Sequence, residues 1–213
     1  MKASRRTSPR VNWTKAELKV LDTLTTPAKI QQFLDSIPYS TEYVYRSPRS
    51  VLRDRKAHCF DGAMFAAAML RRIGYPSLIM DMQAVRDDDH VIAIYKKNGF
   101  WGAVAKSNFV TLRFREPVYK TFRELVLSYF EFFFNVNKEK SMRQYTVPLD
   151  LATFDHIDWM TNDEQLDLIA DKLSDIKVTR VMTPAMIRGL HRVDDRTYKA
   201  AMLGANKAGL YIP

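Results

Sequence analysis

Cysteine is almost absent from this sequence: its 213 residues include a single one, Cys59. One thiol excludes a disulfide framework and a zinc site built from several cysteines. Glycine and proline are also scarce, at 7 and 9 residues, while 46% of the chain is hydrophobic, which excludes collagenous and low-complexity chains. The length suits one domain with a core large enough to fold without covalent crosslinks.

Long apolar runs are missing too. No stretch approaches the roughly 18 consecutive apolar residues that span a bilayer. Residues 1–13 are basic but have no apolar segment behind them, unlike a secretory signal. From these features we expect a reduced, cytoplasmic protein that does not enter the membrane.

The excess of basic residues is concentrated at one end. The formal net charge is +9, and the first nineteen positions hold six basic residues and one acidic residue. We therefore predict a flexible basic tail over residues 1–14. The rest of the chain is nearly balanced, aromatics are not interleaved with the basic residues, and no nucleic-acid-binding signature accompanies them. The sequence thus disfavours a nucleic-acid partner, although binding of nucleic acid or anionic surfaces through the tail remains an alternative.

Hydrophobic periodicity predicts helices, then strands, then helices. Apolar positions from Cys59 onward share one helical face, and Gly74 followed by Pro76 indicates the end of that helix. Asn98-Gly99 is the strongest short hairpin signal between two strands. The order indicates an α+β domain over residues 15–213, with a core at about 45–118 and a helical elaboration at about 119–213. The expected elements are helices at 15–36, 50–55, 59–73 and 121–136, strands at 78–85, 91–95 and 100–105, and helical segments near 162–173, 183–190 and 194–206.

Cys59 and His90 are the residues that point to chemistry. A thiol at a helix start feels the positive end of the helix dipole, which favours the thiolate and lowers the pKa. His90 opens a strand thirty-one residues later, after Asp87-Asp88-Asp89. A histidine beside such a thiol can take its proton and create a nucleophile for an acyl carbon.

Counting along the hairpin suggests a third group. If Asn98-Gly99 is a two-residue turn, paired positions sum to 197, and Ser107 lies opposite His90 on the same face. One bulge would bring Asn108 there instead. An asparagine oxygen can accept the imidazole N–H, so we predict Cys59, His90 and Asn108 as catalytic, with Ser107 as the alternative.

The same residues resemble those of a known family. Cys59 with its apolar helix, Gly74-Tyr75-Pro76, Asp89-His90-Val91 and Trp101 are similar to the transglutaminase-like superfamily over about residues 45–110. The run from Trp101 to Pro117 is similar to bacterial transglutaminase-like proteins of unassigned function. The resemblance implies a papain-like fold in which the cysteine helix packs on an antiparallel sheet, together with peptide or protein amide substrates.

Two features differ from that family. Asn or Ser stands where the superfamily has a triad aspartate. Residues 39–58 contain no Gln, Asn or Trp to serve as an oxyanion-hole side chain, which leaves the Cys59 backbone N–H as one donor and the second unidentified.

The sequence therefore supports cysteine-dependent acyl transfer or hydrolysis of peptide amides through a thioester, as a peptidase, amidase or transglutaminase. A catalytically inactive fold that serves as a binding or scaffold module is the alternative.

The remaining candidates are weaker. Trp101, Arg113 and Arg115 are weak substrate-binding candidates: Arg113 and Arg115 directly follow the predicted triad and could grip an anionic group of a substrate, although a salt-bridge role for the arginines is favoured. Asp87, Asp88 and Asp89 read as a solvated turn because successive side chains diverge. We expect no metal and no cofactor, since metal-ligand spacings and phosphate-binding loops are missing from the sequence. The oligomeric state does not follow from it.

Overall fold

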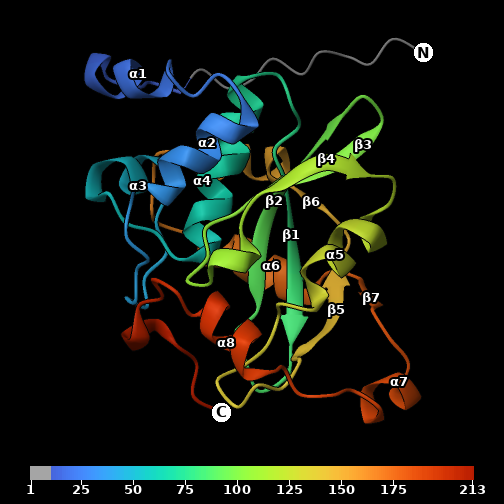
Figure 1. Ribbon diagram of the computed structural model, residues 1–213. Coiled ribbons are helices and arrows are strands. Elements are labelled where there is room, and N and C mark those ends of the chain that lie inside the picture. The colour runs from blue at the N-terminus through green and yellow to red at the C-terminus, as the bar shows by residue number, and fades with distance from the viewer. Residues whose placement is uncertain (1–10) are drawn as a thin grey trace, which may run out of the picture.

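A computed structural model describes residues 11–213. Its centre is an antiparallel sheet with spatial order β4-β3-β2-β1-β5-β7, in which β6 also pairs with β1 (Figure 1). The combination with helices confirms the predicted α+β class. The strands are β1 Leu78–Ala84, β2 His90–Lys97, β3 Phe100–Val104, β4 Arg115–Tyr119, β5 Met142–Thr146, β6 Leu149–Asp150 and β7 Val178–Arg180. The α-helices are α1 Lys15–Leu21, α2 Pro27–Asp35, α3 Pro48–Asp54, α4 Cys59–Arg72, α5 Phe122–Phe130, α6 Asp167–Asp175, α7 Pro184–Arg188 and α8 Asp195–Ala201. Three 3-10 helices complete the elements: η1 Val110–Leu112, η2 Leu151–Ile157 and η3 Lys207–Gly209.

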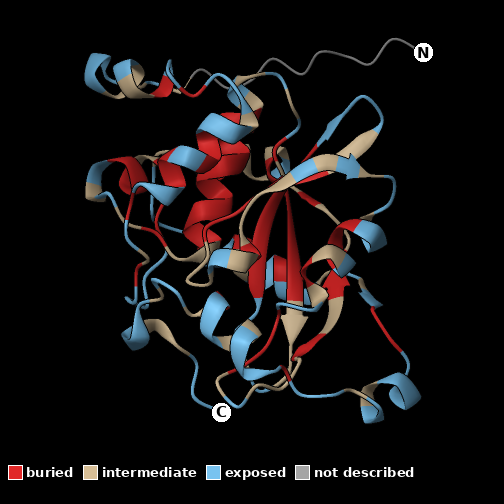
Figure 2. Ribbon diagram, viewed as in Figure 1, coloured by how far each residue is buried: buried red, intermediate tan, exposed pale blue. Residues whose placement is uncertain are grey.

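Helix α4 covers one face of the sheet and is buried along most of its length (Figure 2). Its small residues, such as Ala63 and Ala67, let the helix approach the strands closely, where it packs with Val91 and Ala93 of β2. The helix ends as predicted, at a left-handed Gly74 with φ of 97°. Because the α4 backbone packs closely on the sheet, the position of the first turn of α4 relative to the strands is fixed.

The opposite face of the sheet carries a second core. There α5 contributes Leu125, Val126 and Tyr129, which pack with residues of β1 and β2 such as Met80 and Ile92. Both faces of β1 and β2 are therefore covered, which explains why these strands are buried almost throughout.

The hairpin between β2 and β3 has the predicted register. Lys97 pairs with Phe100, and positive φ angles of 51° at Asn98 and 87° at Gly99 are those of a two-residue type I′ turn. The pairing ends at Val104 of β3, so the chain has left the strand before it reaches Ser107.

Two predicted features of the second half are wrong. The aromatic helix expected over 121–136 spans only Phe122–Phe130, and beyond it Phe133 and Phe134 enter different hydrophobic clusters from a non-helical segment. The elaboration at 119–213 is not purely helical. Strands β5 and β6 pair with the free edge of β1, and β7 extends the sheet beyond β5. A buried strand needs hydrogen-bond partners on both edges, which periodicity does not reveal.

Part of the predicted basic tail is described. Trp13 lies under the Arg49 guanidinium at 5.2 Å, and Arg49 donates to the Asn12 carbonyl. Residues 1–10, which hold the other part of that tail and of the proposed anionic-surface site, lie outside the described residues. In the described part of the chain, none of the helices combines the length and apolar character needed to cross a bilayer.

Candidate active site

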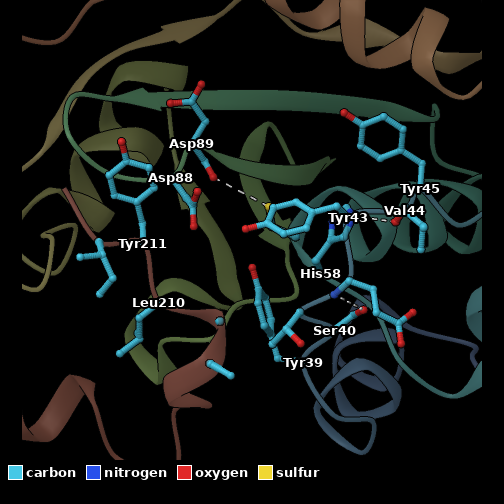
Figure 3. Close-up of a pocket in the computed structure, with 16 residues that line it drawn as sticks. Tyr39, Ser40, Tyr43, Val44, Tyr45, His58, Asp88, Asp89, Leu210 and Tyr211 are labelled. Atoms are coloured by element: carbon cyan, nitrogen blue, oxygen red, sulfur yellow. Dashed lines mark hydrogen bonds between the residues drawn. The ribbon is translucent and has the colours of Figure 1, made fainter.

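Cys59 is the first residue of α4, directly after the N-cap His58. Asp61 in the first turn is fully buried and accepts from the backbone N–H groups of Arg46 and His58, at 2.8 and 3.3 Å. Its carboxylate also lies 3.5 Å from the Arg46 guanidinium. These contacts hold the start of the helix and leave the Cys59 side chain facing a groove, with its sulfur 3.8 Å from the Asp89 carbonyl oxygen that accepts from it (Figure 3).

The thiol does not have the lowered pKa expected from its place at a helix start. Burial raises the pKa of Cys59 to about 12, and the nearby carboxylates Asp81, Asp88 and Asp61 act in the same direction. The Val91 backbone N–H favours the thiolate but is outweighed. Desolvation therefore exceeds the helix-dipole effect, and the thiol is protonated at neutral pH.

His90 begins β2 and lies on the other face of the sheet from α4. Its ring makes edge contacts with Tyr129 and Phe133, at centroid distances of 6.5 and 6.3 Å. Nε2 donates to the Leu112 carbonyl oxygen at 2.8 Å, so Nδ1 carries the lone pair of the neutral ring. Burial lowers the pKa of His90 to about 4, which keeps the imidazole neutral at pH 7.

Within the described chain the thiol and the imidazole do not hydrogen-bond to each other: the thiol donates to the Asp89 carbonyl, and His90 Nε2 donates to the Leu112 carbonyl. The two side chains nevertheless reach one cavity of about 40 Å³ at the end of the sheet, which Ser107 and Asn108 also line. A cavity of this size can hold a water molecule. The structure thus brings all four predicted residues to one place without the predicted contacts.

Asn108 makes its side-chain hydrogen bonds elsewhere. Its Oδ1 accepts from the Asn206 backbone N–H at 2.8 Å, and its Nδ2 donates to the carbonyl oxygens of Asn206 and Gly209 at 2.9 and 3.1 Å. Ser107 Oγ accepts from the Phe109 N–H at 3.0 Å. In this structure the Leu112 carbonyl holds the imidazole, and the orienting role of Asn108 stays a prediction.

A larger groove of about 680 Å³ opens beside the small cavity (Figure 3). Residues 39–45 and 208–212 form its sides, and Cys59 lines both spaces. Tyr211 and Ile212 are exposed here. A cleft therefore reaches the thiol, as a site that acts on an external substrate requires.

The weaker substrate candidates lie in other surroundings. The Trp101 ring packs against the tilted Phe122 ring at a centroid distance of 4.5 Å. Trp101 pairs with Lys96, about 20 Å along β2 from His90 at the usual rise per residue. Arg113 forms an ion pair with Asp35 at 2.9 Å. The Arg115 guanidinium lies 3.8 Å from the centre of the Tyr129 ring. A substrate role for these three residues stays a prediction.

The Asp87–Asp89 turn is less solvated than expected. Burial raises the pKa of Asp87 to about 6, and that of Asp88 and Asp89 also lies above the usual range. Asp89 accepts from the Ala84 N–H, and Asp87 from the Ser141 hydroxyl. Across residues 11–213, no group of three or more potential metal-ligating side chains is placed to hold an ion.

Sequence reasoning missed several groups at the site. Tyr39 lines both the groove and the cavity, Asp81 is a buried carboxyl with one unpartnered oxygen, and residues 206–212 come from far along the chain. Burial raises the pKa of Asp81 to about 7. The alternation of β1 could have placed Asp81 on the α4 face, but the sequence carries no signal for the other two.

Comparison with known proteins agrees with the resemblance seen in the sequence. The model of the transglutaminase-like superfamily matches residues 14–104. Similar solved structures include Legionella pneumophila LapG, 18% identical, covering 41% of this chain and 59% of that chain at a TM-score of 0.34. Its calcium-bound form is 17% identical and covers 42% and 59% at a TM-score of 0.33. The chain thus spans less than two thirds of these structures, and the search of curated proteins gave no match. The family match covers residues 14–104, the part of the chain that holds Cys59, Gly74-Tyr75-Pro76, Asp89-His90-Val91 and Trp101.

Proposed function

We propose that this protein cleaves peptide or protein amides through Cys59, with His90 as the proton acceptor. The observation that carries the proposal is the shared cavity: thiol and imidazole line one small space, and the thiol also lines a groove open to substrate. Catalysis requires a nucleophile and a base within hydrogen-bond reach, directly or through one water.

The site geometry supports a reaction that starts from two neutral groups. His90 Nδ1 takes the thiol proton through a water in the cavity while sulfur attacks the amide carbonyl carbon. The C–N bond then breaks, and the amine leaves with the proton from the imidazolium. Water attacks the resulting thioester and gives one proton to His90. The C–S bond then breaks to release the acid, and the imidazolium returns the proton to sulfur, which regenerates the thiol. The Leu112 carbonyl accepts from Nε2–H and supports the orientation of the imidazole, while orientation by Asn108 stays a prediction.

The test uses acyl transfer from p-nitrophenyl acetate and cleavage of a peptide library. We expect a burst of p-nitrophenolate equal to one thiol per chain, and new amino termini in the library, neither of which Cys59→Ala produces. His90→Ala should slow acylation at least ~10²-fold, as loss of a general base does. His58→Ala is the matched control, because His58 borders the groove but not the small cavity, and should retain most of the rate.

A binding or scaffold function is the second candidate. It is favoured by the resting state, in which the thiol is protonated and the imidazole is bonded on the other face of the sheet. If acylation is missing from the folded wild-type protein, or His90→Ala and His58→Ala behave alike, hydrolysis is excluded and this alternative stands. Repeating the peptide reaction in the presence of a fluorescent cadaverine distinguishes water from an amine as the acyl acceptor. Incorporation of the amine into the peptides would indicate a transglutaminase.

A further inference from the structure

The site needs a second donor for the oxyanion that forms when sulfur attacks a carbonyl. The first is available: Cys59 is the first helical residue, and the N–H groups of a first turn have no partner within their own helix. A single donor stabilises a tetrahedral intermediate poorly, and known sites combine at least two. The residues around the Cys59 N–H are therefore the place to search.

Tyr39 lies beside the residues that lead into α4. An isolated parallel bridge joins Tyr39 to Ala57, and the Ser40 N–H donates to the Ala57 carbonyl at 2.9 Å, which fixes this loop beside the residues that lead into α4. The side chain lines both the groove and the small cavity, and Figure 3 shows its hydroxyl directed into the groove. Cys59 lines the same groove and the same small cavity as Tyr39.

The phenol is fixed in place and keeps its proton. Gly209 packs so closely on the ring that a Cβ there would lie 3.2 Å from Tyr39 Cδ1. Burial, followed by the charges of a Cys59 thiolate and of Asp88, raises the pKa of Tyr39 above its usual value. Within the described residues its O–H donates to no acceptor, which leaves it free for a substrate oxygen.

We propose that the Tyr39 hydroxyl and the Cys59 backbone N–H together form the oxyanion hole. This inference rests on the proposed function. When the thiolate adds to the carbonyl, the electron pair of the C=O bond moves to oxygen, which then accepts hydrogen bonds from both groups. The pair returns when the C–N bond breaks, so Tyr39 gains and loses no proton over the cycle.

Tyr39→Phe tests the role because it removes the hydroxyl and keeps the ring that packs on Gly209. Two reactions of Cys59 are compared: acylation by p-nitrophenyl acetate, which passes through an oxyanion, and alkylation by iodoacetamide, which does not. We expect acylation to fall about 10²-fold, the usual effect of one lost oxyanion donor, with alkylation within twofold of wild type. Tyr75→Phe is the matched control, because Tyr75 follows the far end of α4 and lines neither the groove nor the small cavity, and it should leave both rates unchanged.

The outcomes separate this inference from the proposed function. Acylation of Tyr39→Phe within threefold of wild type would overturn the oxyanion role and leave hydrolysis by Cys59 intact. A parallel loss of acylation and alkylation would show that the hydroxyl only supports packing. A wild-type protein that alkylates but never acylates would overturn the function, and the oxyanion role with it.

Discussion

At the scale of single residues, the environment of Cys59 decides its chemistry. The sequence placed it at a helix start, where the dipole favours a thiolate, yet desolvation and three nearby carboxylates favour the thiol. A helix N-terminus stabilises a nearby negative charge by about 1 kcal/mol. Each unit by which burial raises the pKa destabilises the thiolate by roughly 1.4 kcal/mol, so burial outweighs the helix dipole. The thiol is thus a weak resting nucleophile that depends on a base during the reaction.

This state predicts how alkylation of Cys59 depends on pH. Because only the thiolate reacts and the pKa is raised to about 12, the iodoacetamide rate of the folded protein should rise about tenfold per pH unit from pH 7 to 10 without a plateau. Mass spectrometry of the single-cysteine chain measures it directly.

The control is the same chain unfolded in guanidinium, whose thiol should level off above its ordinary pKa of about 8.5. A plateau of the folded protein below pH 8 would reveal a preformed thiolate–imidazolium pair and contradict the neutral resting state.

His90 shows how far counting along the chain can go. The hairpin rule gave the correct register, with Lys97 opposite Phe100. The alternation of side chains along the strand showed which residues share a face of the sheet with His90. It did not show which of the two faces α4 covers. That choice depends on how the helix crosses the sheet, and here it puts the imidazole against Tyr129 and the thiol on the other side.

At the scale of elements, the contact between α4 and the end of β3 sets the site. Gly62, one turn into the helix, lies against Lys106, two residues beyond β3, whose ammonium donates to the Leu34 carbonyl at 2.8 Å. The sequence gives no reason for a glycine within this helix. The structure does, because a Cβ at Gly62 would lie 2.2 Å from Lys106 Cβ.

Gly62→Ala should therefore destabilise the protein although alanine favours helices by about 1 kcal/mol over glycine. We expect a loss of at least ~2 kcal/mol in the free energy of unfolding, the cost of overpacking, measured by urea denaturation. Gly189→Ala is the matched control, since the nearest atom to its Cβ would be 3.6 Å away, and should change the stability by less than ~0.5 kcal/mol. Equal effects of the two substitutions would contradict the close approach.

At the scale of the whole molecule, the matched core depends on the residues that follow it. Arg71 of α4 forms a two-bond ion pair with Asp155 of η2, at 2.7 and 2.9 Å, and Asp155 also accepts from the fully buried Trp159. On the other face, Met82 of β1 is fully buried in a cluster that includes α5. Both faces and one edge of β1 are thus completed by later segments.

We predict that residues 15–213 unfold as one domain and that a fragment of residues 11–120 does not fold. Without α5, β5 and η2, the fragment exposes the apolar face of β1 and β2 that α5 covers, loses the η2 residues that pack beside α4, and leaves backbone groups of β1 unpaired. Tryptophan fluorescence and far-UV circular dichroism of the whole chain should give one coincident transition. A cooperative transition in the fragment, or two separate transitions in the whole chain, would contradict it.

The sequence by itself determined the α4 boundaries and the β2–β3 register, because helical periodicity, a glycine stop and a type I′ turn are local effects, and it singled out Cys59 and His90 as candidates for chemistry. Tertiary structure decided what those residues do. It put thiol and imidazole on opposite faces of the sheet and raised the pKa of one while lowering that of the other. It also tied Asn108 to residues 206–209 and brought Tyr39 to the start of α4. Desolvation and long-range contacts depend on residues distant in the chain, so no local pattern encodes them.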